Sequence, residues 1–360
     1  MSELKTNKIS TNDQNNVAID NALGLKSYTT TQRDALTGMV AGDIIYNSTD
    51  SKVQVYSGSA WGDAGGVSTA SISYLVIAGG GAGSGCGFQE QGQGGGGAGG
   101  YLNSYSTETS GGNQSTLQPI IVFVDGSTTY QVTVGSGGAG VSGNVGSVGG
   151  SSQFHSVHAM GGGRGGRYNG SIQTVGGCGG GAPRYVAGNS TERLRYGARM
   201  YTGLGAQGFR GGDGNSSGYG GGGGGASEIG GAAGSGSGGN GGDGGDGLSS
   251  SITGTAITRA GGGAGNSNAT GGAGGGANSG GNAGGQNATA NTGGGGSGAG
   301  SYTNATRTGG SGGSGIVILR WATADATITV GAGLTDGGVQ TDGSDSYIVF
   351  TAGTGTITFS

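Results

Sequence analysis

The chain has 360 residues, 100 of which are glycine, and 31% of the sequence is hydrophobic. Glycine makes up about 7% of an average protein, so this composition does not support a conventional core of large apolar side chains. The formal net charge is −4 with 9% charged residues. That balance argues against general nucleic-acid binding, which requires a surplus of Lys and Arg.

The N-terminal zone is predicted to be β-rich. Residues 43–47 and 52–56 have partly alternating β-prone sequences, and residues 48–51 between them have the composition of a turn. Residues 31–36 are compatible with one short helical turn. Because fewer than 80 residues with few large apolar groups make a weak independent core, we expect oligomerisation to supply the missing burial.

Apolar β-prone runs bracket the glycine-rich part of the chain. They are residues 74–78, 120–124, 129–134 and 316–321, followed near the C-terminus by 326–330, 346–350 and 354–359. Asp125-Gly126 separates the second run from the third, and Asp-Gly between two β-prone runs is a strong signal for a hairpin. The glycine content changes after residue 78 and after residue 315. With the bracketing β-prone runs assigned to the glycine-rich part, the predicted zones are residues 1–72, 73–321 and 322–360.

Glycine at this density can form three kinds of structure. Collagen requires glycine at every third position without interruption, and runs such as Gly220 to Gly225 exclude it. A disordered linker is the second possibility, but Tyr, Arg, Asn and Ala interrupt the runs. We favour an ordered stack of extended segments, in which the absence of side chains lets neighbouring backbones approach and hydrogen-bond. The predicted fold class is therefore all-β with glycine-rich, polyglycine-II-like segments.

Motifs for catalysis or metal binding are weak. Residues 241–248 fit one copy of a calcium-binding nonapeptide, but that fold needs tandem copies and the preceding nine residues do not match. His155 and His158 have no nearby acid or cysteine cluster to complete a metal site. The acids are too scattered to nominate a pair for glycan cleavage. We expect no enzyme activity, no metal and no cofactor, and we interpret Cys86 and Cys178 as two small buried thiols.

Several segments carry a likeness to a known family. Residues 31–36, 42–47 and 52–61 together resemble a short β module that is common in phage tail fibre proteins. Residues 73–81, which read Ser-Tyr-Leu-Val-Ile-Ala-Gly-Gly-Gly, and residues 313–318 resemble parts of a glycine-rich domain in phage fibres. The order of these segments resembles phage tail fibre and virion appendage proteins of the marine and cyanobacterial phage type.

The resemblance implies an elongated homotrimeric fibre in the virion, assembled in the host cytoplasm. Residues 1–72 would then attach to other virion proteins and promote oligomerisation. It also implies a role in host attachment, with a host cell-surface glycan or lipopolysaccharide as the partner. We expect no nucleic-acid partner and no membrane insertion, since the longest apolar runs are too short to span a bilayer.

One basic and aromatic stretch interrupts the glycine-rich zone between Arg164 and Arg210 and contains seven of the 15 Lys and Arg residues. Arginine binds carboxylate and phosphate groups through its planar fork, and aromatic rings provide large rigid contact surfaces that suit sugar faces. The receptor-contact candidates are Arg184, Tyr185, Arg193, Arg195, Tyr196, Arg199 and Tyr201. The alternative is that this stretch packs between subunits or against the glycine segments.

From these features we expect a structural component of a phage tail fibre or appendage that contributes to host attachment. The alternative is a passive connector, a capsid fibre or another structural virion protein without a receptor site. A polysaccharide depolymerase is a third hypothesis. The sequence does not distinguish a tail position from a capsid position.

Overall fold

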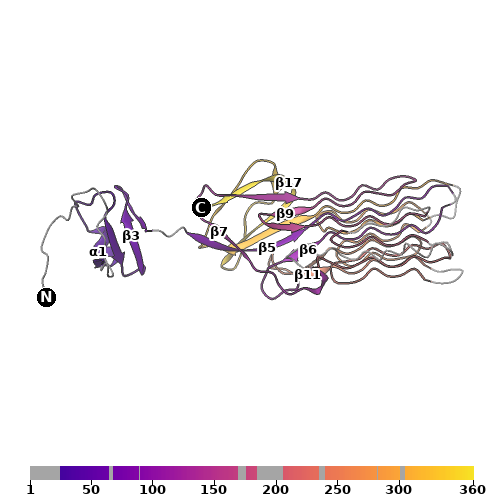
Figure 1. Ribbon diagram of the computed structural model, residues 1–360, viewed down its shortest axis with the longest axis horizontal. Helices are drawn as coiled ribbons and strands as arrows, with labels where there is room; N and C mark the ends of the chain where they lie inside the picture. Colours follow the sequence, from indigo (N-terminus) through magenta and orange to yellow (C-terminus); the bar gives the residue numbers. More distant parts are fainter. Residues whose placement is uncertain are drawn as a thin grey trace, which may run out of the picture. The chain divides into compact units, whose positions relative to one another are not determined.

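A computed structural model describes residues 25–64, 68–88, 90–168, 176–184, 206–234, 240–281, 283–300 and 305–360 of the protein. The chain forms two compact units, Met1–Val67 and Ser68–Ser360 (Figure 1). Within the described ranges it is nearly all β, with seventeen strands, one short α-helix and one 3-10 turn.

The first unit is a four-stranded sheet with the strand order β1-β2-β3-β4. Its elements are β1 (Ser27–Tyr28), α1 (Thr30–Asp34), β2 (Ile44–Asn47), β3 (Lys52–Tyr56) and β4 (Trp61–Asp63). The helix begins at Thr30 because Thr29 and Gln32 form a capping box, in which each side chain accepts a hydrogen bond from the other residue's backbone N–H. The two strands, the turn and the helical turn predicted in this zone are confirmed; residues 52–56 match at both ends, and the other strand and the helix have ends displaced by one or two residues.

The second unit contains a curled antiparallel sheet of eleven strands that approaches a closed barrel. Its main path has the order β10-β9-β8-β17-β13-β5-β6, with β7 paired to β5, and β14, β15 and β16 paired to β17. The strands are β5 (Thr69–Ile77), β6 (Tyr101–Asn103), β7 (Ile120–Phe123), β8 (Thr129–Val134), β9 (Ser152–Phe154), β10 (Val157–Ala159), β13 (Ile316–Ala322), β14 (Ile328–Val330), β15 (Leu334–Asp336), β16 (Gln340–Asp342) and β17 (Asp345–Phe359). The 3-10 turn η1 (Gly111–Asn113) follows β6, and β11 (Leu248–Ser250) and β12 (Ile257–Arg259) form a separate hairpin.

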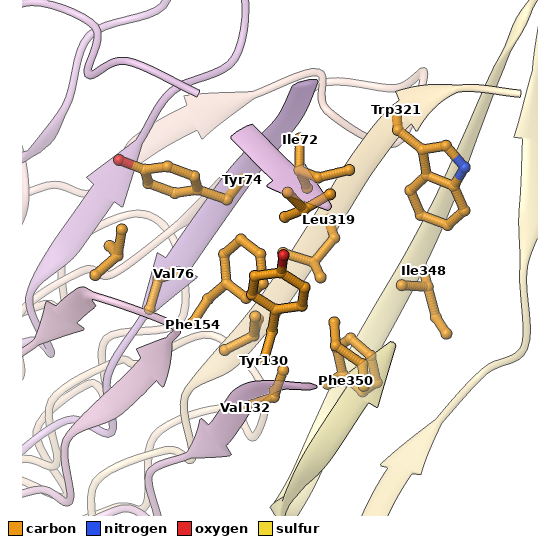
Figure 2. Close-up of a cluster of buried hydrophobic side chains, with 14 of the residues drawn as sticks. Ile72, Tyr74, Val76, Tyr130, Val132, Phe154, Leu319, Trp321, Ile348 and Phe350 are labelled. Carbon is orange, nitrogen blue, oxygen red and sulfur yellow. The ribbon is translucent and has the colours of Figure 1, made fainter. Parts of the chain in front are cut away.

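Side chains on the central strands alternate between two buried faces. On β5, Ile72, Tyr74 and Val76 enter one apolar cluster, whereas Leu75 and Ile77 enter another. The first cluster is the main core, and Figure 2 shows its side chains converging from β5, β8, β9, β13 and β17. The second cluster includes small residues of the glycine segments. Residues 74–77, the second half of β5, are therefore covered on both faces, which explains their continuous apolar sequence, whereas residues 69–72 alternate between exposed and buried positions.

β17 is one long strand where the sequence predicts two. Residues 345–350 pair with β13, and residues 353–358 pair with β8. Gly353 lies at the change of partner with a φ of +98°, a left-handed conformation that favours glycine. A β-carbon at this position would lie 1.9 Å from the carbonyl oxygen of Gly333. The strand can therefore bend from one partner to the next without ending.

The predicted hairpin around Asp125-Gly126 is wrong. The turn forms, with Asp125 Oδ1 accepting from the N–H groups of Ser127 at 2.8 Å and Thr128 at 2.7 Å. The strands on either side do not pair, because β7 pairs with β5 and β8 pairs with β17. The first residues of β5, 69–72, extend beyond its pairing with β13 and leave backbone groups that β7 satisfies.

The glycine-rich segments form an ordered array in which they run side by side away from the strands (Figure 1). In residues 78–86, every third N–H group donates to the same neighbouring segment, at 2.9 to 3.1 Å. The donors are Ala78, Gly81 and Ser84 toward residues 94–100; Gly79, Ala82 and Gly85 toward 144–150; and Gly80, Gly83 and Cys86 toward 307–313. Three residues per turn is the repeat of a polyproline-II-type helix, so the donors rotate through three neighbours.

Carbonyl groups extend the array in three further directions. The carbonyl groups of residues 79–84 accept hydrogen bonds from the N–H groups of three further segments. The donors are Gly162 and Gly165 in one segment, Gly138 in the second, and Gly296 and Ala299 in the third. This segment is therefore bonded to six others, and the run Gly220 to Gly225 has six neighbours in the same way. Backbone hydrogen bonds replace side-chain packing here, because side chains would keep such segments apart.

Segments at the edge of the array carry side chains at their outward positions. Asp243 and Asp246 are three residues apart and both are exposed. Asp243 Oδ1 accepts from the N–H of Thr270 at 2.6 Å, and Asp246 Oδ1 accepts from the N–H of Ala273 at 2.7 Å. These carboxylates replace the segment that is missing on that side. The aspartates of the nonapeptide-like sequence thus act as backbone caps in this array.

Candidate functional site

Several glycine segments begin at the ends of strands and reverse direction at loops that lie at the end of the array away from the sheet (Figure 1). Residues 78–86 follow β5 directly, the chain turns at residues 87–91, and residues 92–100 return to β6. At about 3.1 Å per residue, nine residues place this turn roughly 28 Å from the strand. We call the described side chains in these loops the distal surface; it comprises Phe88, Glu90, Gln91, Asn144, Arg167, Tyr168, Arg184 and Ser216.

An ion pair between Glu90 and Arg167 fixes one part of the distal surface. Two parallel hydrogen bonds join them, Nη2 to Oε1 at 2.7 Å and Nε to Oε2 at 2.8 Å. Glu90 Oε2 also accepts from the N–H of Gly87 at 2.8 Å, and the Glu90 side chain is 10% exposed. Bidentate pairs of this kind are rigid. Arg167 is therefore already neutralised, and its role is to hold the loop in place.

Arg184 has a different environment. Its guanidinium lies 5.4 Å from the centre of the Tyr168 ring, a cation–π distance. Its Nε donates to the carbonyl of Ser216 at 3.2 Å, and its Nη1 donates to Gln91 Oε1 at 3.4 Å. Both partners are neutral, and in the described part of the chain no carboxylate forms an ion pair with Arg184. The guanidinium is thus oriented while its charge stays unneutralised.

This arrangement can bind an anionic or sugar ligand. Arg184 offers a positive charge with remaining N–H donors, and Tyr168 offers a half-buried aromatic ring beside it. Phe88 adds an apolar side chain that is 60% exposed in a neighbouring loop. Carboxylate and phosphate groups match the guanidinium fork, and an aromatic ring provides a rigid apolar surface.

The predicted receptor-contact residues fall mostly outside the described ranges. Arg184 is described and lies in the distal surface. Tyr185, Arg193, Arg195, Tyr196, Arg199 and Tyr201 lie outside the described residues. Sequence reasoning did not assign roles to Phe88, Glu90, Gln91 or Ser216. Their common signal is their position, since each interrupts the glycine pattern at the point where one segment ends and the next begins.

Both cysteines lie inside the array. Cys86 and Cys178 are buried thiols that form no disulfide, which confirms the interpretation of two small buried thiols. Burial raises the pKa of the Cys178 thiol to about 12, because the thiolate would lose its hydration. The Cys178 thiol is therefore not activated as a nucleophile.

Two further features bear on function. Within the described ranges, no group of three or more His, Cys, Asp and Glu side chains gathers as a metal site would require. The same ranges contain no helix with the length and apolar character needed to cross a membrane.

Comparison with known proteins gives a family assignment. The model of a family described as a glycine-rich domain matches residues 59–322. This range is well over half of the chain, and it covers the glycine array and the strands from β5 to β13. A search of curated proteins finds no match. The chain therefore belongs to the glycine-rich domain family.

Proposed function

We propose that this chain is a non-enzymatic structural and adhesive protein of a phage-type fibre or appendage, and that its distal surface contacts a host glycan or lipopolysaccharide. The observation that carries the proposal is the environment of Arg184. A cation held against Tyr168 by two neutral acceptors, with no carboxylate among the described residues paired to it, suits an acidic sugar or a phosphate. Arg167, by contrast, already has its carboxylate in Glu90.

The glycine array supports this function by its stiffness. Every central segment is hydrogen-bonded to six others, so a loop at its end has a fixed position relative to the sheet. Ordering glycine is entropically costly, and the density of backbone hydrogen bonds offsets that cost. Several copies on one particle would convert weak contacts into strong attachment through avidity.

The assembly that we propose is an elongated homotrimeric fibre of a virion, put together in the host cytoplasm. The first unit would join the chain to other virion proteins. The resemblance of residues 31–36, 42–47 and 52–61 to a tail fibre module supports this part of the proposal, and the shortage of buried apolar side chains among residues 25–64 is in keeping with it.

Binding of the full chain to glycan arrays and to purified bacterial lipopolysaccharides tests the receptor contact. We expect Arg184→Ala to weaken the binding of any acidic glycan that the wild-type chain retains by roughly tenfold, the loss of one charge-assisted contact. Arg210→Ala is the matched control, because Arg210 is half-buried and hydrogen-bonds to the carbonyl of Gly211 within the array. Equal binding by both variants would contradict the assignment of Arg184.

Two other outcomes would favour the alternatives. A wild-type chain that binds no glycan or lipopolysaccharide, and whose removal leaves particles intact but still able to adsorb, would indicate a passive connector. Release of new reducing ends from a bound polysaccharide would indicate a depolymerase. The triple variant Arg193→Ala, Arg195→Ala and Arg199→Ala extends the test to the predicted residues outside the described ranges.

A further inference from the structure

In the sheet of the first unit, polar side chains are buried on one face, whereas the opposite face exposes apolar side chains. Among residues 25–64, Ile45 is the one buried apolar side chain. Asn47 and Gln54 share its face and are 0% and 5% exposed. An amphipathic sheet normally buries its apolar side and exposes its polar side, so this distribution needs an explanation.

The polar face is a closed hydrogen-bond network beneath α1. Asn47 Nδ2 donates to Gln54 Oε1 at 3.1 Å and to Asp50 Oδ2 at 2.8 Å, and Arg33 Nη1 donates to Gln54 Oε1 at 3.0 Å. Gln54 Nε2 in turn donates to Asp63 Oδ1 at 3.1 Å. Each of these polar groups thus has a hydrogen-bond partner within the first unit.

The opposite face is apolar and open. The register pairs Ile44 with Val55 and Tyr46 with Val53, and side chains at these positions share one side of the sheet. Ile44 is 50% exposed, Tyr46 and Val53 are each 36% exposed, and Val55 is half-buried. We call these four residues the outer face. Neighbouring positions on the same side, Ser27 on β1 and Gly62 on β4, add no charge.

We propose that the outer face is the surface through which copies of this chain associate. The face carries no charged side chain from its strands, so a second copy meets no like-charge repulsion. Its two strands also differ in size, with Ile44 and Tyr46 on β2 and the two smaller valines on β3. When β2 of one copy lies against β3 of the next, large side chains pack on small ones, as a close-packed interface requires.

Self-association would also add buried apolar contacts to the first unit. Among residues 25–64, one buried apolar side chain makes a small core, and small cores give little stability. Burying the outer face against a copy would provide the missing apolar contact. Because the face is small, we expect a concentration-dependent association that other contacts between the chains can strengthen.

This inference gives a surface to the self-association included in the proposed function, but its test measures association and does not involve a receptor. The two proposals can therefore fail separately. Sedimentation velocity of the full chain over a range of concentrations should show a species heavier than the monomer. Ile44→Glu combined with Val53→Glu should weaken that association by roughly tenfold or more, because a charge is buried without a partner. Val148→Glu is the control, since Val148 is 49% exposed in the second unit.

Cysteine crosslinking provides a test with little effect on folding. With a short bis-maleimide crosslinker, which can join two Tyr46 positions that each face Val53 of the other copy, Tyr46→Cys should give covalent dimers of the full chain. Ser59→Cys should not, because Ser59 is exposed beside a cavity of about 510 Å³ on the other side of the sheet, lined also by Arg33, Tyr56 and Trp61. The native Cys86 and Cys178 are buried and give no background.

A wild-type chain that remains monomeric at every concentration, with no dimer from Tyr46→Cys, would overturn the proposal. The outer face would then belong to a different virion protein or to residues 1–24, which lie outside the described ranges. Dimers formed equally by Ser59→Cys and Tyr46→Cys would also count against it, since they would show association that does not use this face.

Discussion

Gly223 and Gly96 approach each other so closely that a β-carbon on Gly223 would lie 1.9 Å from the carbonyl oxygen of Gly96. Both residues belong to segments at the centre of the array, and the neighbouring residue Ala98 donates to the carbonyl of Gly224 at 3.0 Å. No side-chain rotation can relieve the clash, because a β-carbon has no freedom of its own.

Gly223→Ala should therefore destabilise the protein by roughly 3 kcal/mol or more, the upper end of overpacking in a rigid interior. Thermal or denaturant unfolding of the full chain measures this effect. Gly337→Ala is the control, since a β-carbon on Gly337 meets nothing within 4 Å, and its change should stay within about 0.5 kcal/mol. Equal stability of the two variants would mean that the segments are not packed as described.

The two buried thiols should report on the opening of the array. We expect Cys86 and Cys178 to resist alkylation in the native protein at pH 8 and to react fully in denaturant. Both are fully buried, and the raised pKa of Cys178, about 12, leaves little thiolate at that pH. Mass spectrometry after timed alkylation counts the modified sites. Rapid labelling of the native chain would contradict the burial of these segments.

The turn after β7 should make stability depend on pH in the acid range. Hydrogen bonds from the side chain and backbone of Thr128, and from the backbone of Ser127, hold the pKa of Asp125 well below its usual range. A depressed carboxyl pKa stabilises the folded state fully above the unfolded value of about 3.9 and loses this contribution as the pH falls. The stability advantage of the wild type over Asp125→Ala should therefore be constant near neutral pH and shrink below about pH 4. An advantage that grows in acid would contradict this role.

Arg320 should control how the hairpin of β11 and β12 is attached to the sheet. Its guanidinium is 7% exposed and donates to Asp342 and Asp345, each at 2.9 Å, and to the carbonyl of Ile252 at 3.0 Å. Because the two carboxylates are partly exposed, we expect Arg320→Met to cost about 1–3 kcal/mol, less than a fully buried pair.

Hydrogen exchange gives the location of this effect. Exchange should become faster in residues 248–259 of the Arg320→Met variant and remain unchanged in residues 220–225. Lys52→Met is the control, since the Lys52 and Asp63 side chains are 58% and 30% exposed and such pairs contribute little. A uniform change across the chain would indicate general destabilisation in place of a local attachment.

Local sequence predicted every described strand of four or more residues, but it missed nearly all the shorter strands and did not predict which strands pair. Residues 52–56 and 129–134 are strands with the predicted ends, because β-prone alternation and flanking turn residues act over a few positions. The Asp125-Gly126 turn also forms, yet the strands beside it pair with β5 and β17. The choice of pairing partner depends on which strands elsewhere in the chain have unpaired backbone N–H and C=O groups. A local sequence pattern carries no information about those distant strands.

The order of residues within the glycine segments carries more structural information than the overall glycine content does. Uninterrupted runs such as residues 220–225 lie at the centre of the array, where all directions are occupied by other backbones. Residues 241–247, with aspartate at every third position, lie at an edge where one direction is open. A three-residue count along each glycine segment would have distinguished these positions. It would not have paired Glu90 with Arg167, because they come from loops 77 residues apart in the chain.

The rotation of donors through three neighbours also sets a rule for segment length. One residue added within a central segment turns every later N–H group by a third of a revolution, so that each one faces the wrong neighbour. Three added residues restore the direction of every donor. Insertions and deletions within the array are therefore compatible with the fold only in multiples of three. The loops of the distal surface do not follow this rule and can vary by any number of residues.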